Sequence, residues 1–297
     1  MLKLTSVSGN TQRLDGGAMF GNAPRALWSR WAPPDELGRV ALECRAFLVE
    51  DGEKRVLLET GIGSFFQPEL RERYGVQEPR HVLLDSLRAL GIDDAAIDAV
   101  VLSHLHFDHA GGLLASYEDG SPPRLLFPNA LFVVGKTAWQ RAESPHLRDR
   151  ASFIPELPRL LTSTGRLRIV EAAGDAPRLL GDAFEFVETH GHTPGMLHTR
   201  VRGARCSALF AADLVPGRAW VHLPITMGYD RHPELLVDEK RALLDQLRNE
   251  HGMLLYTHDP EISGSAVELD AKGRYAPKRE VARITAWDLD RDDWPSA

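Results

Sequence analysis

Residues 103–112 read Ser103-His104-Leu105-His106-Phe107-Asp108-His109-Ala110-Gly111-Gly112, directly after the apolar run Ala99-Val100-Val101-Leu102. Three histidines and one aspartate within six residues are costly to bury without partners, and protonated histidines this close repel one another. Neutral imidazoles and carboxylates are ligands of first-row transition metals, zinc above all. In an extended backbone His104 and His106 project to the same side, and Asp108 and His109 follow after a turn. The stretch therefore predicts ligands for two neighbouring metal ions.

The composition is ordinary for a soluble globular enzyme. Hydrophobic residues make up 43% and charged residues 26% of 297 residues, and the net charge is −7. No cluster of lysine and arginine offsets this acidity, so we expect no nucleic-acid partner. No apolar run is long enough to span a membrane, and the first residues contain no apolar signal segment. Cys44 and Cys206 lie in separate apolar runs, which predicts buried free thiols and a cytoplasmic protein.

Hydrophobic patterning indicates an α/β chain. We predict strands over 42–49, 55–59, 98–103, 130–134, 167–171, 183–188, 197–202, 207–212 and 253–256, and a final hairpin over 266–277. Helices are expected over 79–90, from Lys136, and over 233–250, where the leucines form one face and Lys240 lies elsewhere. Prolines interrupt an irregular helical insertion near 140–166, which we place over the site. A single domain over 1–297 is expected, because no repeat or linker is visible.

Three further candidate ligands follow apolar strands. His192 lies in the loop Thr189-His190-Gly191-His192-Thr193-Pro194-Gly195, Asp213 ends the strand at 208–212, and His258 ends the strand at 253–256. Loops that follow buried strands are where an α/β scaffold assembles its site. One such placement alone is weak evidence for a metal ligand. Together with the cluster that follows residues 99–102, four such placements occur in order along the chain, and they predict a shared centre.

The H-x-H-x-D-H run, the G-H-T-P-G loop and the two later strand-end ligands resemble the metallo-β-lactamase superfamily of hydrolases, over nearly the whole chain. The resemblance implies a four-layer αββα sandwich with the site at one edge. It also implies that His104, His106 and His192 bind one metal ion. Asp108, His109 and His258 bind the other, and Asp213 bridges both ions.

The resemblance implies a hydrolase reaction at this centre. A hydroxide bridging the two ions is the expected nucleophile, because two cations lower the pKa of a bound water. Asp108 is expected to carry a proton to the leaving group in addition to binding metal. Zinc is the first choice of metal, and manganese, cobalt or iron stay open.

A narrower resemblance joins the chain to the quorum-quenching N-acyl homoserine lactone lactonases. It rests on Leu14–Gly21 with Pro24–Trp28, on Asp213–Pro216 with Met227–Asp230, and on Thr257–Glu261. A small-molecule lactone is therefore the expected partner, while the acyl-chain preference and a homodimer stay open. We expect five residues to contact the substrate, with core packing as the alternative for the first two: Met19, Phe20, Phe107, His222 and Tyr229.

Two positions depart from the family pattern. Glu59-Thr60-Gly61 stands where the superfamily usually has Asp-Thr-Gly, and we expect Glu59 to brace the metal loops less tightly. Pro216 stands where better-studied lactonases have a tyrosine that assists the substrate carbonyl, so Tyr229 is the candidate catalytic substitute and His222 the second choice. Among the other histidines, His190 and His198 are expected to support ligands, and His81, His146, His232 and His251 to face solvent.

Other activities share these motifs. Sulfur dioxygenases of the same superfamily carry H-x-H-x-D-H but bind one iron ion through two histidines and an aspartate. Phosphotriester hydrolysis uses the same water and Lewis-acid chemistry as lactone opening. Metal content separates the dioxygenase from the dinuclear hydrolase, and turnover separates the two hydrolases.

Overall fold

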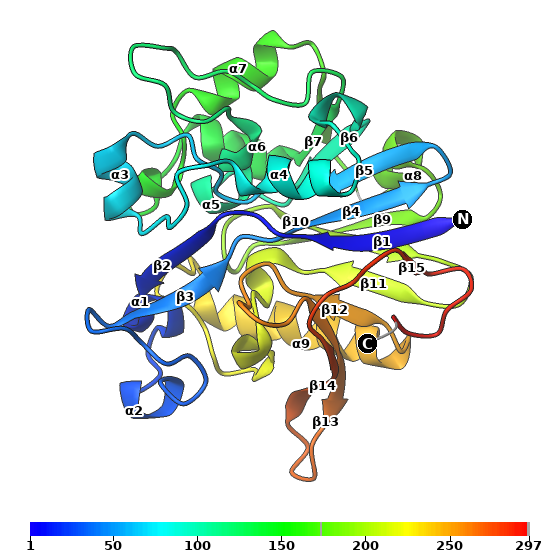
Figure 1. Ribbon diagram of the computed structural model, residues 1–297. Coiled ribbons are helices and arrows are strands. Elements are labelled where there is room, and N and C mark those ends of the chain that lie inside the picture. Colours follow the sequence, from blue (N-terminus) through cyan, green and yellow to red (C-terminus); the bar gives the residue numbers. More distant parts are fainter. Residues whose placement is uncertain (173, 296–297) are drawn as a thin grey trace.

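Two β-sheets packed face to face form the centre of the computed structural model, which describes residues 1–172 and 174–295, and helices cover both outer faces (Figure 1). In order across the first sheet the strands are β15 (Trp287–Asp288), β1 (Leu2–Val7), β4 (Ala46–Asp51), β5 (Lys54–Leu58), β6 (Ala99–Leu102), β7 (Leu131–Gly135) and β8 (Leu167–Val170). The second sheet runs β14 (Tyr275–Val281), β13 (Gly264–Leu269), β12 (Met253–Leu255), β11 (Ser207–Phe210), β10 (Met196–Arg202) and β9 (Phe184–Thr189). A separate ribbon pairs β2 (Thr11–Asp15) with β3 (Arg39–Glu43).

Nine α-helices occur in the part of the chain that the structure describes: α1 (Gly16–Phe20), α2 (Arg25–Trp28), α3 (Pro68–Arg73), α4 (Val82–Ala89), α5 (Phe107–Ala110), α6 (Lys136–Glu143), α7 (Leu157–Ser163), α8 (Asp175–Leu180) and α9 (Pro233–Asn249). Short 3-10 turns are η1 (Asp94–Ala96), η2 (Gly111–Leu113), η3 (Arg150–Ser152), η4 (Ala212–Leu214) and η5 (Arg218–Val221). No helix among the described residues is long and apolar enough to cross a membrane.

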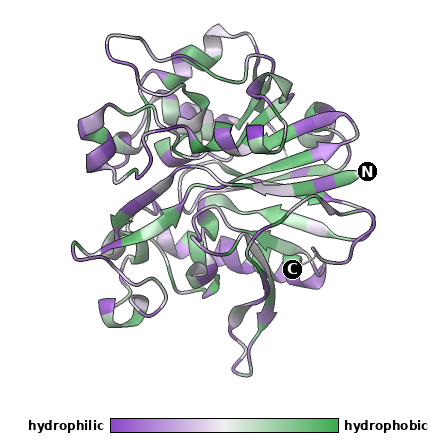
Figure 2. Ribbon diagram, in the orientation of Figure 1, coloured by the Kyte–Doolittle hydropathy of each residue, from purple (hydrophilic) through white to green (hydrophobic). Residues whose placement is uncertain are grey.

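The four layers follow from strands that are apolar on both faces. In β6, Ala99 and Val101 belong to the core between the sheets, while Val100 and Leu102 belong to the core beneath α4, α6 and α7. Strands buried on both faces are continuously apolar because helices cover the side that does not meet the other sheet. Hydrophobic residues concentrate along these central strands (Figure 2). The predicted αββα sandwich is therefore confirmed.

The predicted strand over 42–49 is wrong in its extent. β3 ends at Glu43, Cys44 and Arg45 form a bend, and β4 begins at Ala46. The apolar run is continuous, but its two halves pair with different partners, β3 with β2 and β4 with β1. Cys44 thus lies in the bend rather than in a strand. Cys206 directly precedes β11 and is only half-buried.

Lys240 on α9 is fully buried, contrary to the prediction that it lies off the apolar face. Its Nζ donates to the carbonyl oxygens of Trp220 at 3.0 Å and Ile225 at 2.7 Å. These bonds satisfy the ammonium group that burial removes from water. The lysine therefore ties α9 to the loop that contains η5.

The insertion near 140–166 contains η3, α7 and extended segments, as its prolines indicate. Phe153 forms an antiparallel β-bridge with His106, and its ring lies edge-on to that imidazole at 4.9 Å. The insertion therefore contacts the candidate site directly.

Candidate metal centre

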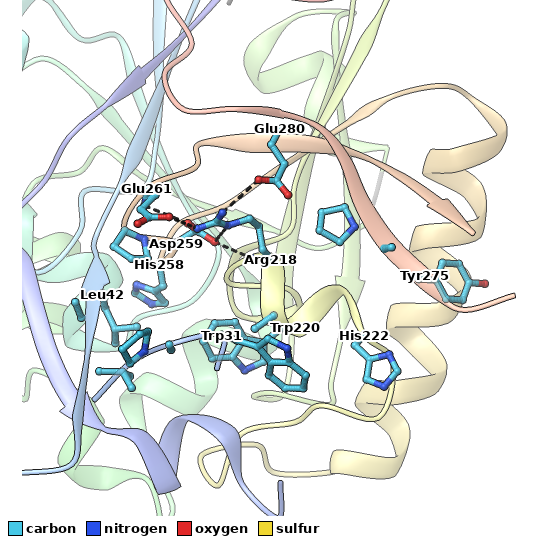
Figure 3. Close-up of a pocket in the computed structure, with 18 of the residues that line it drawn as sticks. Trp31, Leu42, Arg218, Trp220, His222, His258, Asp259, Glu261, Tyr275 and Glu280 are labelled. Atoms are coloured by element: carbon cyan, nitrogen blue, oxygen red, sulfur yellow. Dashed lines mark hydrogen bonds and ion pairs between the residues drawn. The ribbon is translucent and has the colours of Figure 1, made fainter. Parts of the chain in front are cut away.

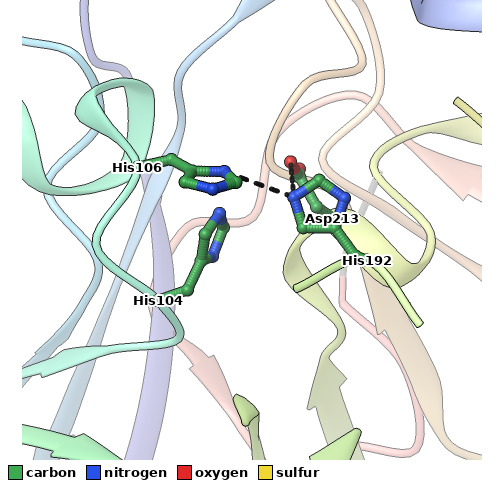
Figure 4. Close-up of side chains that lie close together, drawn as sticks. All are labelled: His104, His106, His192 and Asp213. Carbon is green, nitrogen blue, oxygen red and sulfur yellow. Dashed lines mark hydrogen bonds and ion pairs between the residues drawn. The ribbon is translucent and has the colours of Figure 1, made fainter. Parts of the chain in front are cut away.

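The candidate ligands come together from loops that follow β6, β9, β11 and β12. Among the described residues, one group brings ligand atoms within 4.8 Å of one another: His104, His106, His192 and Asp213 (Figure 4). His192 Nε2 lies 3.2 Å from Asp213 Oδ2 and 3.4 Å from His106 Nδ1. This is the set that the sequence predicts for the first metal ion.

A second group of ligand atoms within the same limit consists of Asp108, His109 and His258. Asp108 Oδ2 lies 3.8 Å from His109 Nε2 and 3.6 Å from His258 Nε2. Asp213 also reaches this group, because its Oδ2 is 3.2 Å from His109 Nε2 and its Oδ1 is 3.2 Å from His258 Nε2. Asp213 therefore lies between the two groups, where the sequence predicts a bridging ligand.

The orientation of the rings fits a cation at the centre. Four of the five clustered histidines use Nδ1 for a protein contact: His104 with Ser103 Oγ at 2.8 Å, His109 with Glu59 Oε2 at 2.7 Å, His192 with Asp230 Oδ1 at 2.8 Å, and His258 with the Glu43 carbonyl at 2.7 Å. In each of these residues Nε2 is left for the centre. Nε2 of His104 is buried and has no hydrogen-bond partner among the described residues. Metal-binding histidines bind a protein acceptor through their other nitrogen in the same way.

Glu59 braces this arrangement. Its carboxylate accepts from Ser103 Oγ and contacts His109 Nδ1, and the side chain is fully buried. The residue has a left-handed backbone conformation, with φ of 61°, which non-glycine residues rarely adopt. The longer glutamate thus supports two residues of the metal loop from one position.

Gly111 and Gly112 are required by close packing behind the ligands. A Cβ atom on Gly112 would lie 2.1 Å from the Thr60 carbonyl oxygen, and one on Gly111 would lie 2.3 Å from that of Ile62. The glycines therefore let the turn after His109 lie directly on the segment that begins at Glu59.

Burial and charge shift the pKa values of the clustered histidines in opposite directions. Burial, together with the neighbouring histidines, lowers the pKa of His104 and His106 well below the usual range. For His109 burial opposes the charge, but the carboxylates of Glu59 and Asp213 outweigh it and raise the pKa well above the usual range. Asp213 and its neighbours thus favour positive charge at the centre, which a bound metal ion also supplies.

A cavity of about 160 Å³ opens onto the ligands. Of the five predicted substrate residues, three line it: Met19, Phe107 and Tyr229. Burial, followed by the charge of Asp108, raises the pKa of Tyr229 to about 12, so its hydroxyl keeps its proton at neutral pH. Tyr229 is therefore a hydrogen-bond donor at the cavity.

Two predicted substrate residues lie elsewhere. Phe20 is fully buried and stacks on Trp28 at 5.4 Å and on Trp220 at 4.6 Å between ring centroids. It is a core residue because neighbouring positions on the short helix α1 point in different directions, and Met19 takes the cavity side. His222 lines a different, larger cavity.

Other residues of the site escaped the sequence reasoning. Tyr74, Ala151 and Ser152 line the cavity, and Asp230 supports His192 while its Oδ2 accepts from Met227 N at 2.6 Å. The stretch Met227–Asp230 belongs to the narrower resemblance, but its local sequence gives no signal that Asp230 contacts His192. His81 was expected to face solvent but is buried, with Nε2 3.1 Å from the Gly112 carbonyl oxygen.

Comparison with known proteins identifies the family of the chain. Residues 39–258 match the Metallo-beta-lactamase superfamily. The match covers most of the chain, so the protein belongs to this superfamily. The chain is 24% identical over 245 residues to an N-acyl homoserine lactonase of Bacillus thuringiensis, covering 77% of this chain and 85% of the relative. The chain also matches the cytochrome P450 monooxygenase mpaDE of Penicillium roqueforti, at 29% identity over 33% of this chain. The chain spans only 12% of the length of that protein.

Solved structures extend the fold assignment to almost the full length. A probable metal-dependent hydrolase from Staphylococcus aureus superposes with a TM-score of 0.84 at 22% identity, covering 96% of this chain and 98% of its own. The dizinc quorum-quenching lactonase AidC, in complex with a product, gives a TM-score of 0.69 at 21% identity over 93% of this chain and 94% of its own.

Proposed function

We propose that the protein is a dinuclear hydrolase that opens a lactone or ester, with an N-acyl homoserine lactone as the leading substrate. The observation that carries this proposal is the position of Asp213 between two ligand groups, 3.2 Å from His192 on one side and from His109 and His258 on the other. One ion requires only one of these groups. Two complete groups that share a carboxylate favour a dinuclear centre over the mononuclear iron of a sulfur dioxygenase.

The residues have distinct roles in this proposal. His104, His106 and His192 would hold one ion and Asp108, His109 and His258 the other, with Asp213 shared. Two divalent ions, zinc in the first instance, would supply Lewis acidity and a water of lowered pKa.

Asp108 and Tyr229 face the cavity beside these ligands. We assign Asp108 to proton delivery to the leaving alkoxide, because its carboxylate lies at the cavity wall and is partly exposed. We assign Tyr229 to hydrogen-bond donation toward the substrate carbonyl, since its pKa of about 12 keeps the hydroxyl protonated. It occupies the role that Pro216 cannot perform.

The cavity suits a small ring with an apolar substituent. Its 160 Å³ leave room for a lactone next to the ligands, and Met19, Phe107 and Tyr74 provide apolar surface for an acyl chain. The relatedness to an N-acyl homoserine lactonase at 24% identity supports this substrate class.

Proton release from short- and long-chain acyl homoserine lactones tests the proposal, using zinc-loaded protein whose metal content is measured. We expect two metal ions per chain and turnover that Asp213→Asn reduces by orders of magnitude. Asp238→Asn, at an exposed position on α9, is the matched control.

Three outcomes would contradict parts of the proposal. One iron ion per chain would favour the dioxygenase. Two ions with hydrolysis of paraoxon but no lactone would favour a phosphotriester hydrolase. Full activity of Asp213→Asn would refute the bridging role.

A further inference from the structure

A second cavity, of about 630 Å³, lies outside the metal centre between the N-terminal segment 31–42, the η5 loop and the hairpin of β13 and β14 (Figure 3). The proposed reaction uses none of this space. His258 lies on the wall of both cavities, so the second cavity adjoins one metal ligand from another side. Its volume is in the range of sites for small organic molecules.

Aromatic and aliphatic side chains form one wall of this cavity. Val40 and Leu42 of β3 line it, together with the indoles of Trp31 and Trp220. Trp220 is fixed, because it stacks on Phe20 and its Nε1 donates to the Met19 carbonyl at 3.1 Å. The Trp31 side chain is 40% exposed, which leaves its ring available to a ligand. This wall therefore suits the apolar or aromatic part of a ligand.

The opposite wall carries an excess of negative charge. Arg218 is surrounded by three carboxylates, at 2.9 Å from Asp259, 2.7 Å from Glu261 and 3.2 Å from Glu280. Both carboxylate oxygens of Asp259 already accept hydrogen bonds. Oδ2 accepts from Arg218, and Oδ1 accepts from the backbone N–H groups of residues 261 and 262.

Neither the Arg274–Asp270 pair nor His222 offsets this excess. Arg274 and Asp270 pair with each other at 2.7 Å, so together they add no net charge. Burial, followed by the nearby Arg274 charge, lowers the pKa of His222, which leaves that imidazole neutral at pH 7. Arg218 compensates one of the three negative charges of Asp259, Glu261 and Glu280, so two negative charges remain at the rim.

We propose that this cavity is a second binding site, for a small amphipathic organic cation such as an arylalkyl amine. The aryl or alkyl part would pack on Trp31, Val40 and Leu42, and the ammonium group would lie beside Glu261 and Glu280. Aromatic rings attract cations in addition to providing apolar contact area. An anionic ligand of the same shape would instead meet a wall where three carboxylates share the single positive charge of Arg218.

A matched pair of probes tests charge separately from shape. Calorimetric titration of the zinc-loaded protein with 3-phenylpropylamine and with 3-phenylpropionate, at pH 7.5, compares ligands of nearly equal size and opposite charge. We expect the amine to bind at millimolar or lower concentration and the carboxylate to bind at least tenfold more weakly. Equal Kd values, or no binding of the amine, would overturn the proposal.

Substitutions in the cavity wall test whether the amine binds in this cavity. Glu261→Gln combined with Glu280→Gln should weaken the amine about three- to tenfold, the range that two partly exposed ion pairs provide. The matched control is Glu143→Gln combined with Glu268→Gln, at exposed positions that do not line the cavity, and it should leave the Kd unchanged.

Trp31→Ala tests the apolar wall and should weaken the amine further. An amine that binds all variants with the wild-type Kd binds elsewhere, and that result would refute the site. Lactone turnover has no part in these measurements, so their outcome is independent of the proposed reaction.

Discussion

Asp230 provides a direct test of how the protein prepares a metal ligand. Its carboxylate is fully buried, with Oδ1 2.8 Å from His192 Nδ1 and Oδ2 2.6 Å from the backbone nitrogen of Met227. Both neighbours are donors, so both carboxylate oxygens must accept. Asp230→Asn replaces one acceptor with an NH₂ group and therefore opposes a donor to a donor at one of the two contacts.

The expected loss of zinc affinity in Asp230→Asn can be placed in a range. Loss of the partner of a metal-binding histidine typically weakens metal binding by about 10- to 100-fold. This factor corresponds to about 1.4 to 2.8 kcal/mol, which matches the roughly 1.5–3 kcal/mol of a hydrogen bond to a charged group. Because His192 belongs to only one ligand group, one of two zinc equivalents should weaken and the other should change little.

Competition with a chromophoric zinc chelator at fixed pH measures both equivalents, and thermal unfolding of the metal-free protein monitors the fold. Asp238→Asn, whose carboxylate is 71% exposed, is the control with the same chemical change. Wild-type affinity for both equivalents in Asp230→Asn would refute the assigned support of His192. An equal loss for both would refute the division into two groups.

Four other variants test packing, specificity and buried charge. Gly112→Ala should destabilise the protein by about 2 kcal/mol or more in urea unfolding, because the new Cβ would lie 2.1 Å from the Thr60 carbonyl oxygen. Met19→Ala should lower kcat/KM for long-chain lactones about tenfold more than for short ones, whereas Phe20→Ala should cost about 3–5 kcal/mol of stability instead. Burial lowers the pKa of Lys240 from 10.5 to about 7. Between these values the unfolded chain holds the proton and the folded chain does not, so stability should rise by about 1 kcal/mol per pH unit, and Lys240→Met should remove this slope.

Gly112→Ala and Lys240→Met each have a matched control in the chain. Gly174→Ala adds a Cβ that meets nothing within 4 Å and should be nearly neutral. Lys272→Met removes an exposed lysine from the β13–β14 turn and should keep the pH slope. A stable Gly112→Ala, equal effects of Met19→Ala on both chain lengths, or an unchanged slope in Lys240→Met would each contradict the corresponding argument.

The sequence predicts which candidate ligands cluster, because their signal is local. An apolar strand that is buried on both faces must end where the chain leaves the sheet, and polar side chains at that point face a common edge. His104 and Asp213 both follow this rule. Other ligands are supported from far along the chain. Asp230 contacts His192 across 38 residues, and the Glu43 carbonyl contacts His258 across 215 residues. No periodicity in the sequence indicates such contacts.

Some errors came from reading residue type instead of position. Lys240 lies four residues after Leu236 and three before Leu243, so its spacing places it on the apolar face of α9, and only its charge argued otherwise. The bend at Cys44 and Arg45 has no such signal. Arg45 is buried there because its guanidinium donates to the carbonyls of Tyr256 at 2.8 Å and Asp259 at 3.0 Å. Charged residues that satisfy distant carbonyls therefore interrupt patterns that are otherwise apolar.

Protein contacts hold the loops that carry the candidate ligands. Backbone bonds from Glu43 N to the His258 carbonyl and from Arg45 N to the Thr257 carbonyl join the bend after β3 to the loop after β12, independently of any ligand atom. Protein contacts at Nδ1 fix four of the five imidazoles, and His106, the exception, turns Nδ1 toward His192 and is bridged to Phe153 by its backbone. Among the described residues, most of the nitrogen atoms that face the centre thus contact other candidate ligands, above all Asp213 at 3.2 Å. Cation binding would relieve the contacts between facing ring nitrogens, such as the 3.3 Å between His109 and His258.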